Sequence, residues 1–379
     1  MTAVSRHVER AVLFGADRPL RLRSGRTLTD VHVAYERFGP PDPSGERTVF
    51  VCHALTGDSH VTRHHSDDRP GWWEAMVGPH RPIDTRRFHV VCANVLGGCA
   101  GTTGPAPDPR WPARAPFPQI EVADMVTVHR ELLRRLGVPL RLYAVVGGSL
   151  GGMQALEWLL RHPRDAGRFG LIATSARLSA DNLAQNAVAR AAILADPRFR
   201  GGRYPACDPP VTGLGIARMV GHLTYMSQES LEAKFGRDLS PGREGRSAPY
   251  TLPGPYAVER YLEHQAHKLT KRFDANSYLC LTAAMDRFDP FAEPHDDIAA
   301  ADPDVCVLSF RSDRLFGLDH SRFIAERLLK AGVRCAHVHE ESSRHGHDAF
   351  LKDVPAYLDA MARWLGTRAR PAVPSSPHP

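Results

Sequence analysis

The five residues 147–151, Gly-Gly-Ser-Leu-Gly, constrain the fold of this chain more than any other segment. They follow an apolar run at 142–146 and precede residues 153–160, which have the composition of a helix. A serine between glycines at a strand-to-helix turn is typical of a nucleophile elbow, because side chains beside it would block the tight reversal. We therefore expect Ser149 to present a reactive hydroxyl at a helix N-terminus, where backbone N–H groups stabilise an oxyanion. The alternative is a glycine-rich turn with an incidental serine.

A serine nucleophile needs an acid and a histidine, which follow it in that order in chains with such an elbow. A second apolar strand, residues 305–310, leads into Asp313, and an acid just past a strand end lies on the elbow's edge of a parallel sheet. His347 lies in a loop between the last predicted strand and the last predicted helix. We predict that His347 accepts the Ser149 proton and that buried Asp313 fixes the imidazole tautomer and stabilises the imidazolium.

Other residues compete for these two roles. Asp319 and Asp286 are rival acids, and the chain contains 20 histidines. His345 lies only two residues from His347, so spacing alone does not exclude it. His337 and His339 alternate along a predicted strand and are better interpreted as structural residues.

The order of predicted elements indicates one α/β domain with an insertion. Short apolar runs alternate with helices and loops from about residue 12 to 174, which predicts a mostly parallel sheet. The sequence then has a helical and polar composition until about residue 300, and strand-like sequence resumes at Val305. We expect a core in two parts, 12–177 and 301–366, a helical lid at 178–300, and a disordered Pro/Ser-rich tail at 367–379.

Composition limits the function classes. No apolar run is long enough to span a membrane, and no secretion signal is recognisable. The net charge is +6, but the arginines are dispersed among acids, so nucleic acid is not an expected partner, whereas an anionic co-substrate fits a positive field. Seven scattered cysteines lack zinc-ligand spacing and predict a reduced, cytoplasmic protein without a metal.

Seven motifs occur in a fixed order along the chain: residues 53–60 (HALTGDSH), 94–105 (NVLGGCAGTTGP), 148–158 (GSLGGMQALEW), 223–225 (LTY), 234–237 (KFGR), 276–279 (NSYL) and 346–351 (GHDAFL). Together they resemble homoserine O-acetyltransferases, an acyltransferase branch of the α/β-hydrolase fold. The resemblance extends from about Gly15 to Leu365. The fold that this resemblance implies is an α/β-hydrolase core with an inserted helical lid.

The resemblance also implies a reaction. Such an enzyme takes acetyl from acetyl-CoA onto Ser149 and passes it to the side-chain hydroxyl of L-homoserine, a step in methionine biosynthesis. It holds no permanently bound cofactor, and its lid forms a homodimer interface. Transfer to an amino acid has to exclude water, which is the physical reason for a lid.

Further site residues follow from the same motifs. The residue after the nucleophile, Leu150, supplies one oxyanion N–H by its position, and by resemblance the N–H of Leu55 supplies the second. The family places an arginine on the acceptor's carboxylate and an aspartate on its ammonium group, and Arg218 and Asp348 match these positions. Two more positions match the substrate site, Tyr225 and Thr56.

Three segments depart from the family pattern: Leu150 replaces a more usual methionine, and the loops 108–118 and 343–345 are altered. These loops lie near the acyl and acceptor pockets by resemblance. L-serine as acceptor and succinyl-CoA as donor therefore remain alternatives, and Arg114 or Arg344 would provide the cation for a succinyl carboxylate. A plain esterase or a catalytically silent binding protein are the other classes considered.

Overall fold

The structure is a computed structural model that describes residues 7–107, 117–240, 256–293, 295 and 297–366. Arg114, most of the altered loop 108–118 and the predicted disordered tail 367–379 lie outside these residues. Among the described residues, no helix combines the length and apolar character needed to cross a bilayer.

An eight-stranded sheet forms the centre of the molecule, with the strand order β1-β4-β8-β5-β9-β10-β11-β12. The pairs from β8 to β12 are parallel, whereas β1 and β4 add an antiparallel edge. The strands are β1 (Glu9–Leu13), β4 (Val31–Phe38), β5 (Thr48–Cys52), β8 (His89–Ala93), β9 (Ala144–Gly148), β10 (Arg168–Ile172), β11 (Asp304–Phe310) and β12 (Cys335–Glu340). Two small ribbons pair β2 (Leu20–Arg21) with β3 (Thr27–Leu28) and β6 (Val77–Gly78) with β7 (Ile83–Asp84).

Helices cover both faces of this sheet, which is why every residue of β5, β8 and β9 is buried. One hydrophobic cluster includes apolar residues of α1 (Val122–Arg135), α2 (Leu150–Arg161) and α8 (Leu318–Lys330). A second cluster includes α9 (Pro355–Trp364) together with Trp73 and Met76 from the loop after β5. The predicted α/β-hydrolase architecture with a mostly parallel sheet is confirmed.

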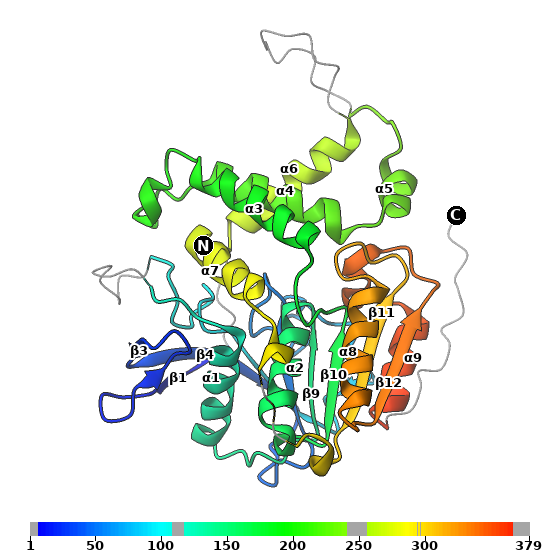
Figure 1. The fold of residues 1–379 in the computed structure, drawn as a ribbon. Coiled ribbons are helices and arrows are strands. Elements are labelled where there is room, and N and C mark those ends of the chain that lie inside the picture. The colour runs from blue at the N-terminus through cyan, green and yellow to red at the C-terminus, as the bar shows by residue number, and fades with distance from the viewer. Residues whose placement is uncertain (1–6, 108–116, 241–255, 294, 296, 367–379) are drawn as a thin grey trace.

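In the described part of the segment between β10 and β11, where the sequence predicts an insertion, the chain forms five α-helices. They are α3 (Ala180–Leu194), α4 (Val211–Tyr225), α5 (Gln228–Phe235), α6 (Ala257–Thr270) and α7 (Ala275–Asp286). In Figure 1 α3, α4, α5 and α6 sit above one end of the sheet, and α7 descends toward it. The remaining short 3₁₀ helices are η1 (Pro163–Asp165), η2 (Arg200–Gly202), η3 (Pro290–Ala292), η4 (Ala299–Ala301) and η5 (Gly346–Leu351).

The turn from β9 to α2 is the predicted elbow. Ser149 has φ 58° and ψ −124°, a backbone conformation that is strained for any residue other than glycine. A Cβ on Gly147 would lie 2.2 Å from the carbonyl oxygen of Gly151, and one on Gly151 would lie 2.1 Å from that of Cys52. Both glycines are therefore required by the close approach of strand, turn and neighbouring strand.

The variant Gly151→Ala is expected to lower the free energy of unfolding by roughly 1–3 kcal/mol, because the added methyl pushes α2 away from β5. Gly215→Ala is the matched control. It makes the same change inside α4, where the nearest atom to the new Cβ is 3.4 Å away. That control should keep or slightly raise stability, since alanine favours helix over glycine. Equal melting temperatures for the two variants would contradict this account of the elbow.

Candidate active site

A hydrogen bond joins the two predicted partners of Ser149. His347 Nδ1 lies 2.8 Å from Asp313 Oδ2, and both side chains are buried. The other Asp313 oxygen accepts the backbone N–H groups of Leu315 and Phe316, at 2.8 and 2.9 Å. The carboxylate is thus fixed by its own loop, and it holds the imidazole with Nδ1 protonated and Nε2 free to act as a base.

Ser149 and His347 line one cavity between the core and the inserted helices α3, α4 and α7. Ser149 is 6% exposed and His347 is 3% exposed, so both lie largely out of bulk water. Gly346 directs the histidine there: its φ is 69°, its N–H donates to Ser312 Oγ at 3.0 Å, and a Cβ would lie 2.5 Å from the Ser227 backbone nitrogen. The short helix η5 therefore enters the cavity beside the end of α4, with no room for a side chain at position 346.

Charge sets the protonation of His347. Burial alone lowers its pKa, but the Asp313 carboxylate, by charge and by hydrogen bond, outweighs burial, and Asp348 adds to this effect. The net result is a pKa of His347 raised above its ordinary value. An imidazolium formed during a reaction is consequently stabilised at this position.

The rival acids and histidines lie elsewhere. The Asp319 side chain is 96% exposed, and Asp286 pairs with Arg190 at 2.7 Å. His337 contacts Ser321 Oγ and His339 contacts Ser309 Oγ, each at 3.0 Å, from strand β12. His345 is exposed and faces a separate surface hollow.

The two predicted oxyanion donors belong to segments that the structure ties together. Leu55 lines the cavity with Ser149, and no group among the described residues accepts its backbone N–H. Leu150 is the first residue of α2, where N–H groups have no partner within the helix. The Gln154 side chain, one turn further along, donates to the carbonyls of Leu150 and His53 at 3.1 Å each. This contact fixes the loop that carries Leu55 against the helix that carries Leu150.

Sequence reasoning missed this supporting network. His53 Nε2 accepts the Val95 N–H at 3.0 Å, so its Nδ1 carries the proton and donates to the Ala54 carbonyl at 2.7 Å. Asn94 Nδ2 approaches the same Nε2 at 3.1 Å. The signal was present, because these residues lie inside the quoted motifs, but only the fold shows that the three motifs meet.

The predicted acceptor residues line the same cavity as Ser149: Arg218, Asp348, Tyr225 and Thr56. The Arg218 guanidinium lies over the Tyr225 ring, 5.4 Å from its centre, and the Tyr225 ring is 6.0 Å from that of His347. Arg218 Nε is buried and has no hydrogen-bond partner among the described residues. One cavity therefore holds a cation, a carboxylate residue and the Ser149 hydroxyl.

Known proteins resemble this chain over most of its length. Residues 47–353 match the family described as alpha/beta hydrolase fold. A protein of Magnetococcus marinus named homoserine O-succinyltransferase is 43% identical over 368 residues, covering 93% of this chain and 92% of its own. One of Rhodopseudomonas palustris named homoserine O-acetyltransferase is 43% identical over 363 residues, covering 93% and 89%. The chain belongs to the homoserine O-acyltransferase family.

Solved structures support the fold of this acyltransferase. A homoserine O-acetyltransferase from Bacillus anthracis superposes with a TM-score of 0.82 at 23% identity, covering 96% of this chain and 98% of that one. Esterase E22 superposes with a TM-score of 0.81, also at 23% identity, covering 94% and 100%. Because both identities are low, these likenesses concern the fold alone.

Proposed function

We propose that the chain transfers an acetyl group from acetyl-CoA to the side-chain hydroxyl of L-homoserine, through an acetyl-Ser149 intermediate. One observation carries this proposal: Ser149 and His347 share a cavity with Arg218 and Asp348. A simple ester hydrolase has no need of a cation and an anion placed for an amino acid. Acetyl-CoA acts as a co-substrate, and no permanently bound cofactor is required.

Acylation comes first. His347 Nε2 takes the proton from the Ser149 hydroxyl as the oxygen attacks the thioester carbonyl. The N–H groups of Leu55 and Leu150 stabilise the resulting oxyanion. When the tetrahedral intermediate collapses, the C–S bond breaks and His347 returns its proton to sulfur. CoA leaves as the thiol and Ser149 keeps the acetyl group.

Transfer to the acceptor follows. Arg218 binds the α-carboxylate through its planar fork, and Asp348 binds the α-ammonium. His347 removes the proton of the homoserine hydroxyl, whose oxygen attacks the acetyl-Ser149 carbonyl. Collapse breaks the ester bond to Ser149 and returns the proton to its Oγ, releasing O-acetyl-L-homoserine. The lid helices exclude competing water from this step, and we propose that they also form a homodimer interface.

Succinyl-CoA is the second candidate donor, because relatives of equal identity bear both names. A succinyl group adds a carboxylate that needs a cation. Arg344 is exposed and lies 3.8 Å from Glu229, and Arg114 is outside the described residues. A surface hollow lined by Lys234 and Lys352 also borders Asp348, and these two ammonium groups are candidate partners for the succinyl carboxylate.

The pH dependence of acylation tests the base. The first-turnover rate of CoA release should rise with pH, because only neutral His347 accepts the Ser149 proton. Its pKa is raised, so the rate is lost as pH falls through a midpoint above about 6.5, the value of free imidazole. His345→Ala is the control and should leave the profile unchanged. A flat profile would contradict the assignment of His347 as the base. A profile that is displaced in His345→Ala would assign the base to His345 instead.

The substrates are tested by measuring CoA release from acetyl-CoA and succinyl-CoA, each with L-homoserine, L-serine or no acceptor. Strong stimulation by homoserine with acetyl-CoA is the expected result. Preference for succinyl-CoA or for serine would retain the mechanism and change the substrate. Equal release with and without acceptor would contradict transfer and identify a hydrolase.

A further inference from the structure

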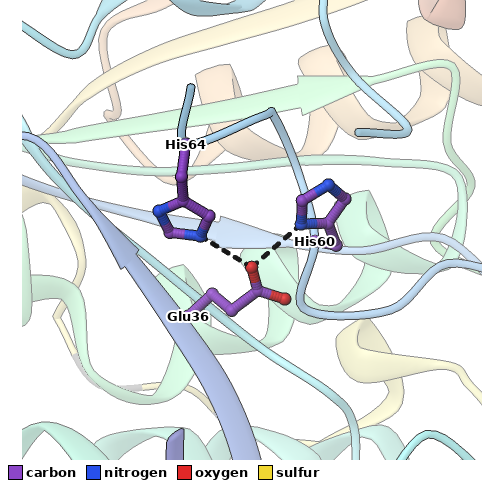
Figure 2. A group of neighbouring side chains, drawn as sticks. All are labelled: Glu36, His60 and His64. Atoms are coloured by element: carbon purple, nitrogen blue, oxygen red, sulfur yellow. Dashed lines mark hydrogen bonds and ion pairs between the residues drawn. The ribbon is translucent and has the colours of Figure 1, made fainter. Parts of the chain in front are cut away.

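A buried cluster of two histidines and a glutamate lies outside the catalytic cavity. Glu36 belongs to β4, and His60 and His64 belong to the loop after β5 (Figure 2). Both imidazoles face the same carboxylate oxygen: Glu36 Oε2 is 2.9 Å from His60 Nδ1 and 2.8 Å from His64 Nε2. The side chains are 0%, 1% and 16% exposed in the order Glu36, His60, His64.

The hydrogen bonds around His60 place its Nδ1 opposite the glutamate. His60 Nε2 lies 2.8 Å from the backbone carbonyl of Arg69, which only accepts, so Nε2 carries a proton. In a neutral imidazole the lone pair is then on Nδ1, the atom that faces Glu36 Oε2. Two electron-rich atoms at 2.9 Å need a cation between them, either a proton or a metal ion.

We propose that Glu36, His60 and His64 bind a divalent transition-metal ion of the zinc class. Two imidazole nitrogens and one carboxylate oxygen are ligands that Zn²⁺ accepts, with bonds of about 2.0–2.2 Å. The three donor atoms lie within 4.8 Å of one another. Ligands of a tetrahedral zinc ion are about 3.3 Å apart, so small side-chain movements bring all three to bonding distance.

Neighbouring groups orient the side chains of this cluster. The Arg69 carbonyl orients His60, and Ser59 Oγ donates to the second Glu36 oxygen at 3.1 Å. The His64 ring stacks on Phe38, with ring centres 4.3 Å apart. Such outer contacts fix the ring orientation and tautomer of metal-bound histidines.

A metal ion bound here would stabilise the fold and would not take part in the reaction, because none of its three ligands lines the catalytic cavity. It joins β4 to the loop that follows β5. That loop also carries Leu55, the proposed oxyanion donor. The scattered cysteines led us to expect no metal. Glu36 is 24 residues before His60, so only the fold brings this cluster together.

Zinc binding to tag-free, chelator-treated protein tests the proposal, independently of acyl transfer. Calorimetric titration with zinc chloride should show one equivalent bound, retained after gel filtration and counted by elemental mass spectrometry. Binding of Co²⁺ should give the visible absorption of tetrahedral nitrogen and oxygen coordination. Glu36→Gln and His64→Gln should each weaken binding by more than about tenfold, since even outer-shell changes cost that much.

His65→Gln is the matched control, because His65 is exposed and adjacent but outside the cluster. It should bind zinc like the unaltered protein. Circular dichroism establishes that each variant is folded, and His64→Gln, at the partly exposed ligand, suffices if Glu36→Gln does not fold. No retained equivalent in the unaltered protein, or equal affinity in folded His64→Gln, would overturn the proposal and leave an ion-paired structural cluster.

Discussion

Replacing Ser149 by alanine is expected to lower acyl transfer by at least about 10⁴-fold, because it removes the hydroxyl that forms the proposed covalent intermediate. The variant should still fold, because only the serine hydroxyl is removed and the elbow backbone is unchanged. Both proposed oxyanion N–H groups therefore stay in place. Intact-protein mass spectrometry after incubation with acetyl-CoA should detect the acetyl adduct on the unaltered protein and none on the variant.

Ser175→Ala is the control for this experiment. Ser175 Oγ lies 2.7 Å from His320 Nδ1, which makes a second serine–histidine pair, but neither residue lines the cavity. The control should therefore form the acetyl adduct. An adduct that persists in Ser149→Ala and disappears in Ser175→Ala would move the nucleophile to Ser175.

Replacing Arg218 by alanine should lower kcat/KM for homoserine roughly 100-fold, because it removes two charge-assisted hydrogen bonds of about 1.5 kcal/mol each. The acetylation half-reaction, measured as the first-turnover release of CoA, should change little. Hydrolysis of a simple acetyl ester should also survive, since it uses Ser149 and His347 without the amino-acid groups.

Arg198→Ala is the matched control, because Arg198 is 54% exposed, lies 3.5 Å from Asp208 and does not line the cavity. It should retain homoserine transfer. If Arg218→Ala lowered transfer and ester hydrolysis equally, Arg218 would support the cavity as a whole and the assignment of the acceptor carboxylate to it would be wrong.

Local signals were sufficient for the fold and for the order of the catalytic groups. The glycines around Ser149 are demanded by sterics within a few residues, and the strand before Asp313 is a plain apolar run. Such features are encoded where they act. The helical composition between β10 and β11 likewise reports that segment's own structure.

Contacts between distant segments could not be predicted in the same way. The Gln154 side chain links α2 to the carbonyl of His53. Glu36 on β4 contacts two histidines of the loop after β5. Neither contact produces a recognisable residue spacing in the sequence, because the partners are brought together by the order of the strands in the sheet. The choice of Asp313 and His347 over their rivals also required the fold, through the 2.8 Å contact between them.

The proposed reaction requires that acetyl-Ser149 is discharged by an amino-acid hydroxyl and not by water. A single-turnover chase tests it directly: protein acetylated with acetyl-CoA is freed of CoA, mixed with L-homoserine or buffer, and followed by intact mass. Homoserine should discharge the adduct much faster than buffer, and O-acetyl-L-homoserine should appear in an amount equal to the adduct lost. An adduct lost at the same rate in both mixtures, with acetate as the product, would contradict it.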